Sequence, residues 1–309
     1  MRTTCIINNY NYGAYVGEAI ESVFNQSIAF DEIVVVDDGS TDNSVGMIEK
    51  AIAPHQNVKV IAKHNEGQLS CFNAGFSAST GDLIFFLDSD DAYKKNYLEC
   101  ALDLYESNAE CDFAWCAVER FGRNHGVRHT NEGYCRKTGD VGYSVASTLY
   151  MRKWVGGPTS SISIKRHVLD KILPIPFLQE WRTRADDCLV YGSSLVGARK
   201  YYLAKPLVNR RTHAENSHFG KSFNKKYKYA RKLAQEQLFL FILAKNNLPR
   251  NRLYGFVLRE FRQLPSPDYE LLKLYRKILL ASDFPVTRKC GKVIALYKSY
   301  LIKKHRNGA

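Results

Sequence analysis

The sequence has no run of apolar residues long enough to cross a lipid bilayer. Its longest apolar runs, such as Leu238 to Ala244, are far below the roughly 20 residues that a membrane span needs. The N-terminus leads directly into a predicted strand, without a signal peptide. We therefore expect a cytoplasmic protein that is either soluble or peripheral on the inner face of the membrane.

Zinc motifs are also lacking. The eight cysteines form no Cys-x-x-Cys pair, and no group of His and Cys has the spacing of a zinc site. Cys5 and Cys116 fall inside apolar segments, where a reduced thiol behaves as a small hydrophobic side chain. These features predict a reducing compartment.

Acidic residues are scarce in the C-terminal part of the chain. Residues 221–309 contain 21 Lys or Arg and 5 Asp or Glu, a net charge of +16, whereas residues 1–220 carry a net charge of −3. The hydrophobic content of 45% is that of a globular protein. We predict two parts, residues 1–220 and a basic extension over 221–309. The charge of the extension is typical of a segment that meets an anionic membrane surface or nucleic acid, and a solvated helical face is the alternative.

The densest group of acidic residues follows an apolar run in the first part. The five consecutive large apolar residues Leu83 to Leu87 predict a strand that is buried on both faces. Asp88, Asp90 and Asp91 follow at once, and ligands bind at the carboxyl ends of strands in open α/β sheets. Carboxylates packed this closely repel one another unless a cation lies among them. Mg²⁺ and Mn²⁺ commonly bind such carboxylates together with substrate phosphates, so the stretch indicates a metal and phosphate site.

An Asp-rich segment after a strand also has a purely structural interpretation. It can turn the chain and cap the next helix, which we predict from about Tyr97 to Tyr105 with Asp91 as a candidate cap. Because Asp-x-Asp alone is a weak motif, the rest of the chain has to decide between the two interpretations.

Strand and helix patterns alternate at short intervals along the first part. This alternation predicts an α/β fold with a mostly parallel sheet, right-handed crossovers and flanking helices. Residues 120–157 fit neither pattern, and we predict a long surface loop or an insertion there. The predicted strands are 3–7, 32–36, 58–61, 83–87, 113–118, 159–164 and 200–203, and the predicted helices begin near residues 15, 44, 69, 97, 166 and 186.

Polar residues also follow the first two predicted strands. The turn-prone residues 8–13 suit a ligand-facing loop or an ordinary strand-to-helix turn. After the second strand, capping explains the Ser, Thr and Asp residues that follow Gly39. Capping does not need the adjacent pair Asp37 and Asp38, so one of these two is available to a ligand.

Two further charged groups lie later in the first part. Asp186 and Asp187 open a predicted helix, and stabilisation by the helix dipole is their structural explanation. Arg210, Arg211 and His213 stand close together after a predicted strand, as in a clamp for an anion.

The basic extension is helical in period. Helices are predicted around residues 227–245, 253–263, 269–282 and 292–304, with prolines as breaks. The last of these has an apolar stripe with lysines beside it, which fits a basic amphipathic helix on a membrane. Packing on the rest of the chain or on a partner is the alternative. The stripe is Val293, Leu296, Tyr297, Tyr300 and Leu301, and the lysines are Lys292, Lys298, Lys303 and Lys304.

Taken in chain order, these motifs resemble those of the family 2 glycosyltransferases, which have the GT-A fold. The resemblance covers roughly residues 3–217 and implies a GT-A catalytic domain over 1–220. Each motif is weak alone, whereas six in the right order and spacing are specific. They are Ile6–Asn11, Val34–Asp42, Asn65-x-Gly67 with Asn73-x-Gly75, Phe86–Asp91, Asp186-Asp187 and Arg211-x-His213.

The resemblance implies roles for particular residues. Asp37 would accept a hydrogen bond from the N–H of a uracil base, and Asp88 and Ser89 would face the ribose. Asp90 would hold the Mn²⁺ or Mg²⁺ ion that bridges the diphosphate. The full implied set is Asn9, Tyr10, Asp37, Asn65, Gly67, Asp88, Ser89 and Arg211 for the nucleotide, and Asp88, Asp90 and His213 for the metal.

Asp187 matches the general base of the inverting members, with Asp186 beside it. The chemistry supports these residue types independently, because an acceptor hydroxyl must lose its proton as it attacks and a carboxylate can take it. A divalent cation spanning the diphosphate neutralises the charge that grows as the glycosidic bond breaks. One base without an enzyme nucleophile implies a single displacement, so the anomeric configuration should invert.

The sequence departs from the family pattern at four positions. Asn8 and Asn9 replace the usual Pro and Thr, which changes the shape of the base pocket. Phe72 replaces an Arg and removes a phosphate contact, and Asp186 replaces a Glu. None of these changes removes the metal ligands or the base.

The expected activity is metal-dependent transfer of a sugar from a nucleotide-diphosphate donor, UDP-linked, to a hydroxyl of a glycan or lipid-linked acceptor. The expected partners are the donor, the acceptor and an anionic membrane surface at residues 221–309; nucleic acid is not expected. One alternative is a non-catalytic protein that binds nucleotides or polyanions through its basic tail. Another is a nucleotidyltransferase, which normally has a Gly-rich basic loop near its first strand; this chain has none. Acceptor selectivity should lie in residues 120–160 and in the tail.

Overall fold

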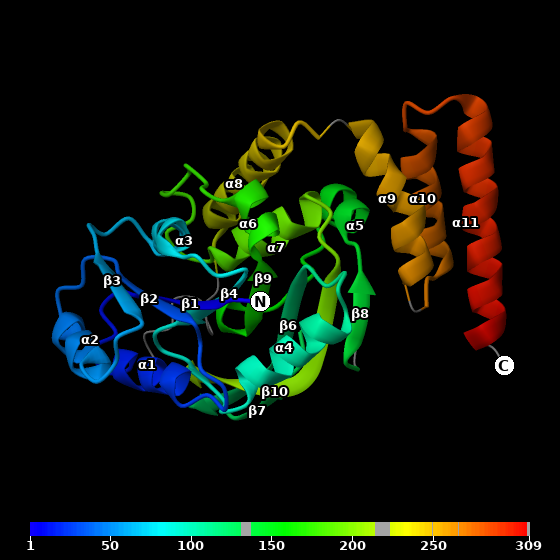
Figure 1. Cartoon of the computed structure of the whole chain (residues 1–309). Helices are drawn as coiled ribbons and strands as arrows, with labels where there is room; N and C mark the ends of the chain where they lie inside the picture. The colour runs from blue at the N-terminus through cyan, green and yellow to red at the C-terminus, as the bar shows by residue number, and fades with distance from the viewer. Residues whose placement is uncertain (131–136, 214–222, 249, 265, 308–309) are drawn as a thin grey trace.

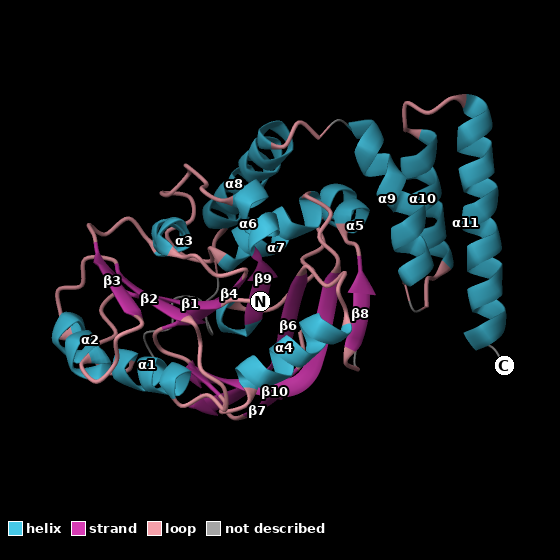
Figure 2. Ribbon diagram, in the orientation of Figure 1, coloured by secondary structure: helices cyan, strands magenta, loops and turns pink. Residues whose placement is uncertain are grey.

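One sheet runs through the first part of the chain. The computed structural model describes residues 1–130, 137–213, 223–248, 250–264 and 266–307. Figure 2 shows the sheet with helices on both of its faces. Its strands are β1 (Thr3–Asn9), β2 (Glu32–Asp37), β3 (Val58–Ala62), β4 (Leu83–Asp88), β5 (Ala92–Tyr93), β6 (Phe113–Gly122), β7 (Gly126–Arg128), β8 (Gly139–Gly142), β9 (Ile162–Lys165) and β10 (Lys200–Thr212).

The strand order is β3-β2-β1-β4-β9-β6-β10-β5, with β7 on β6 and β8 on β10. The neighbours β3, β2, β1 and β4 are parallel, and so are β6 and β10. Between these two groups, β9 runs antiparallel to both β4 and β6. The α/β class predicted from the sequence is confirmed, and the sheet is mixed because β9 and the short strands β5, β7 and β8 are reversed.

Helices cover the two faces of the sheet (Figure 1). On one face, α1, α2 and α4 pack against Cys5, Ile7, Val35, Phe85 and Leu87. On the other face, α3, α6, α7 and α8 pack against strand residues that alternate with the first set, because successive side chains of a strand point to opposite faces. These helices are α1 (Val16–Phe24), α2 (Ser44–Ile52), α3 (Gln68–Ala78), α4 (Tyr97–Ser107), α6 (Arg166–Ile172), α7 (Asp186–Leu195) and α8 (Lys225–Lys245).

Helix α8 shares the core of the first part, although the predicted boundary lies at residue 220. Its buried residues Ala234, Leu238, Phe239 and Ile242 belong to the cluster on the α3 and α7 face. The remaining helices α9 (Arg250–Gln263), α10 (Tyr269–Leu280) and α11 (Val286–Asn307) have an apolar cluster of their own. Figure 1 shows them as a group at one end of the molecule, beside α5 (Val145–Met151) and β8.

A buried carboxylate joins this group to the rest of the chain. Glu260 of α9 accepts hydrogen bonds from the backbone N–H groups of Ala146 and Ser147 at 2.6 and 2.7 Å, at the start of α5. The hydroxyl of Tyr275 donates to the same carboxylate at 3.2 Å. Burial raises the pKa of Glu260 to about 7.

Three local expectations need correction. Residues 120–157 are not one long loop where they are described, because β6 continues to Gly122 and β7, β8 and α5 follow; residues 131–136 lie outside the described residues. The predicted strand at 159–164 begins with a 3₁₀ turn over Thr159–Ser161, and the strand itself is β9. The strand predicted at 200–203 extends to Thr212 as β10, with a shift of register near Pro206.

The apolar stripe predicted in the last helix mostly packs inside the helical group. Leu296 is fully buried, and Val293, Tyr297 and Tyr300 pack against the same cluster, whereas Leu301 is exposed. Of the two alternatives left open by the sequence, packing therefore accounts for most of this stripe. Among the described residues, no helix combines the length and the apolar character that crossing a membrane requires.

Candidate functional site

The two acidic groups singled out from the sequence line one cavity of about 700 Å³. Asp88 and Asp90 reach it from the end of β4 and the turn that follows, and Asp186 and Asp187 reach it from the first turn of α7. The carboxyl ends of the parallel strands β1 and β4 open into the same space, as expected for an α/β sheet. Other predicted site residues that line it are Asn9, Tyr10, Asn65, Gly67, Ser89 and Arg211.

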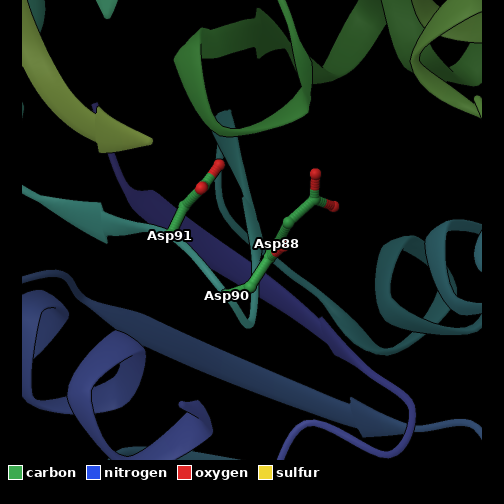
Figure 3. Close-up of side chains that lie close together, drawn as sticks. All are labelled: Asp88, Asp90 and Asp91. Carbon is green, nitrogen blue, oxygen red and sulfur yellow. The ribbon is translucent and has the colours of Figure 1, made fainter. Parts of the chain in front are cut away.

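The acids after β4 could hold a cation. Asp88, Asp90 and Asp91 each offer a carboxylate oxygen, and these atoms all lie within 4.8 Å of one another (Figure 3). Burial, followed by repulsion from Asp88, raises the pKa of Asp90 to about 7. Burial also raises the pKa of Asp88. A divalent cation among these oxygens would remove the repulsion, and hard ions such as Mn²⁺ or Mg²⁺ prefer oxygen ligands, so the residues fit such an ion.

Asp91 is held by its protein neighbours. The hydroxyl of Ser160 donates to one of its oxygens at 2.7 Å, and the backbone N–H of Arg211 donates to the other at 2.9 Å. Asp91 is 4% exposed and does not line the cavity. Asp91 therefore ties β10 and the segment before β9 to the turn after β4, and Asp88 and Asp90 are the acids that face the cavity.

His213, which the family resemblance implies as a metal ligand, lies beside Asp90. Its Nε2 is 3.0 Å from Oδ2 of Asp90, and its ring contacts the rings of Tyr12 and Tyr15. His213 does not line the cavity itself, and its role at a metal stays a prediction.

The two neighbouring arginines of β10 differ in their surroundings. Arg211 donates through Nε to the backbone oxygen of Asp90 at 3.1 Å and pairs with Glu18. Its guanidinium lies over the rings of Tyr15 and Phe121. Arg210 lines the cavity, and its positive charge lowers the pKa values of the acids after β4 and of Asp186 against the effect of burial. The sequence named both arginines as part of an anion clamp, and the structure shows that Arg210 is the cation that acts on both acidic groups.

The predicted base lies between two guanidinium groups. Arg184 donates to Oδ1 of Asp187 at 3.3 Å, and Arg231 of α8 donates to Oδ2 at 2.9 Å. The backbone N–H of Asp187 donates to Asp186 at 3.0 Å. Burial, followed by repulsion from Asp187, raises the pKa of Asp186 to about 7.

Most of the predicted nucleotide-binding residues line the cavity, whereas Asp37 does not and instead bonds to one of them. Asp37 is 2% exposed and does not line the cavity, since Asn9 and Ser40 donate to its carboxylate at 2.8 and 2.6 Å. Asp38, the second acid of the pair, does line it and accepts a hydrogen bond from the N–H of Gly67 at 2.7 Å. The contact between Asp37 and a base stays a prediction, and in the structure Asp37 holds Asn9.

Gly67 is required by the path of the chain. Its φ is +98°, a conformation that other residues rarely adopt. A Cβ atom there would lie 2.3 Å from Cα of Arg182. Arg182 in turn donates to the side chain of Asn65. The motif Asn65-x-Gly67 therefore lets the segment before α7 approach the start of α3.

Gln68 connects the two acidic groups, although no sequence motif pointed to it. Its Nε2 donates to Asp88 at 2.8 Å, and its Oε1 accepts a hydrogen bond from the backbone N–H of Ala185 at 2.9 Å. Ala185 directly precedes Asp186 and Asp187. One amide side chain thus sets the separation between the acids after β4 and the first turn of α7.

Comparison with known proteins identifies the class. The model of the family described as Glycosyl transferase family 2 matches residues 4–173. This match covers more than half of the chain, so the chain belongs to glycosyl transferase family 2 and is a glycosyltransferase, as the motifs implied.

Individual relatives agree with the family. The uncharacterized glycosyltransferase alr2836 of Nostoc sp. is 34% identical over 220 residues, which are 71% of this chain and 67% of that protein. The minor teichoic acid biosynthesis protein GgaA of Bacillus subtilis is 29% identical over 204 residues, which are 63% of this chain and 44% of that protein. The chain thus spans less than half the length of GgaA.

Solved structures confirm the fold. The crystal structure of S. aureus TarS 1-349 in complex with UDP-GlcNAc aligns with a TM-score of 0.60 and 17% identity, over 100% of this chain and 92% of that chain. The TarS 1-349 structure in complex with UDP aligns with a TM-score of 0.56 and 18% identity. The GT-A fold expected from the motifs is therefore confirmed, including the presence of C-terminal helices.

We predict that replacing Gln68 with Met lowers sugar transfer by about 10- to 100-fold, because misplacing a catalytic group by about 1 Å has effects of that order. The thioether keeps the length of the side chain but bonds neither Asp88 nor the N–H of Ala185. The measurement is the release of nucleoside diphosphate from a panel of nucleotide sugars. Gln237→Met, at an exposed position of α8, is the matched control. Turnover of Q68M equal to that of the control would contradict a bridging role.

Proposed function

We propose that this protein is a metal-dependent, inverting glycosyltransferase that transfers a sugar from a UDP-linked donor to a hydroxyl of a glycan or lipid-linked acceptor. The observation that carries this proposal is the shared cavity of Asp88, Asp90 and Asp187. It combines candidate metal ligands with a candidate base, and it has room for a nucleotide sugar between them. The similarity of the fold to TarS, which was solved in complex with UDP-GlcNAc, supports the choice of a UDP-linked donor.

On the donor side, Asp88 and Asp90 would hold Mn²⁺ or Mg²⁺, with His213 supporting Asp90. When bound, the ion supplies positive charge against the diphosphate, which becomes more negative as it leaves. Arg210 adds a fixed positive charge beside the same acids. Asn9, Tyr10 and Ser89 would form the wall around the nucleoside, with Asp37 behind Asn9 and with Asn65 and Gly67 at its edge.

On the acceptor side, Asp187 would take the proton of the attacking hydroxyl. The acceptor oxygen forms a bond to the anomeric carbon, and the bond from that carbon to the phosphate oxygen breaks. The electron pair of the broken bond leaves with UDP. Because one base acts and no enzyme nucleophile takes part, the configuration at the anomeric carbon inverts.

Asp90→Asn should abolish stabilisation by Mn²⁺ and UDP, because a neutral amide is a poor ligand for a hard divalent cation. The measurement is the shift of the unfolding temperature on adding MnCl₂ and UDP together, which a ligand of the folded state raises. Asp103→Asn, at a position of α4 that does not line the cavity, is the control. An equal shift for D90N and wild type would contradict the metal assignment.

Asp187→Asn should lower transfer by at least about 100-fold, because removing a general base has effects of that order. Donor binding should change little, since Asp187 is not among the proposed ligands of the metal or the nucleotide. The two measurements are UDP release from UDP-GlcNAc with Mn²⁺ and the thermal shift with UDP. Near-normal turnover of D187N would show that another group takes the proton.

The proposal includes a peripheral membrane partner, and the outer face of α8 supports it. Tyr229, Leu233 and Leu240 are 64, 53 and 68% exposed, and their spacing places them on one face of the helix, away from the buried residues of α8. Lys225, Lys226, Lys228 and Lys232 lie on the same helix. Apolar residues beside lysines and a tyrosine suit the surface of an anionic bilayer.

Leu233→Gln combined with Leu240→Gln should release the protein from vesicles that contain phosphatidylglycerol, because the apolar contacts are lost. Cosedimentation of wild type should be weaker with pure phosphatidylcholine and should fall with salt. Val60→Gln, at an exposed position of β3, is the control. Salt-dependent binding to RNA without binding to vesicles would instead favour the polyanion-binding alternative.

A further inference from the structure

One guanidinium of α8, beyond the family-matched segment, contacts the proposed base. The family model ends at residue 173, and Arg231 lies on α8, well beyond it. Its Nη2 donates to Oδ2 of Asp187 at 2.9 Å. Its Nη1 donates to the backbone oxygen of Glu180 at 2.9 Å, and its guanidinium carbon lies 4.0 Å from the centre of the Trp181 ring.

These three contacts hold the guanidinium in one position. A planar guanidinium that stacks on a ring and donates through two of its nitrogens has little freedom to rotate. The Arg231 side chain is 16% exposed and that of Asp187 is 6% exposed, so water screens this pair weakly. The other cation at this carboxylate, Arg184, is 44% exposed and lies farther away, at 3.3 Å. Of the two arginines, Arg231 is therefore the one built to orient Asp187.

We propose that Arg231 is a positioning residue, which holds Asp187 in the orientation from which it takes the proton of the acceptor. This inference rests on the proposed function, in which Asp187 is the base. With Oδ2 fixed by Arg231 at 2.9 Å, the oxygen presented to the hydroxyl is Oδ1, whose contact with the more exposed Arg184 is longer, at 3.3 Å. Helix α8 thus completes the catalytic centre as well as the core.

The inference also explains how α8 is joined to the site. The buried residues of α8 pack on α6 and α7, and Arg231 extends this contact to the first turn of α7, where Asp187 lies. A shift of α8 would move the guanidinium and the carboxylate together. Helix α8 therefore contributes to catalysis without touching the substrate.

Arg231→Met should lower kcat for UDP release from UDP-GlcNAc with Mn²⁺ by about 10- to 100-fold, since a misplaced base has effects of that order. The KM for the donor should stay within about two-fold, because Arg231 is not among the residues that line the cavity. Arg231→Lys should recover part of the loss, and guanidinium ion should partly restore Arg231→Ala. A role confined to stability would give neither recovery.

Arg152→Met is the matched control. Arg152 also pairs with a carboxylate, Glu236 of α8, and lies over an aromatic ring, Phe239, but it does not touch Asp187. R152M should keep the turnover of wild type. Turnover of R231M equal to that of R152M would overturn the inference while leaving the proposed function intact.

A double substitution separates positioning from an independent effect. Because Arg231 acts through Asp187, the variant with both Asp187→Asn and Arg231→Met should be no slower than Asp187→Asn alone. Multiplied losses would overturn the inference. If R231M fails to fold, Arg231→Lys is compared with wild type instead. A lower kcat of R231K supports the inference, and an equal kcat overturns it.

A failure of the proposed function has a different result. Wild type would then release no nucleoside diphosphate from any donor in a panel of nucleotide sugars, and the inference would fall with it. The contact itself is tested without activity, by comparing unfolding temperatures of the two single variants and the double variant. Additive shifts would overturn the contact between Arg231 and Asp187 even in an active enzyme.

Discussion

The site depends on the repulsion between carboxylates that the fold buries together. Asp88 and Asp90 lie at the end of a strand covered on both faces, and burial raises the pKa of each. At the start of α7, burial and repulsion from Asp187 likewise raise the pKa of Asp186. Burying such groups costs folding free energy unless positive charge or hydrogen bonds compensate. The proposed metal and substrate would bring that positive charge and those contacts.

The protein compensates part of this cost with contacts that also set the geometry. Arg210 acts on both acidic groups, Gln68 connects Asp88 to the first turn of α7, and Arg231 pairs with Asp187. Asp91, by contrast, does not line the cavity, and protein groups donate hydrogen bonds to both of its oxygens. Neighbouring acids of one motif thus have different roles, and their hydrogen-bond partners account for the difference.

Local sequence patterns were sufficient for most of the fold. The buried strands β1, β2 and β4 and the helices that follow them were predicted within a few residues, because apolar runs and helical periodicity are local signals. The short strands β7 and β8 were missed, since they are largely exposed and pair at the margins of β6 and β10. The reversed direction of β9 also depends on its neighbours, and nothing within its four residues indicates it.

The sequence by itself determined the family, the fold class and the acidic motifs, because these rest on residue types at fixed spacing along the chain. Tertiary structure alone decided which acids face the cavity, since Asp37 and Asp91 differ from Asp38 and Asp90 only in the partners that surround them. It also decided the roles of Gln68 and Arg231. Each of these meets its acid across a long stretch of chain, and contacts between distant segments leave no local pattern in a single sequence.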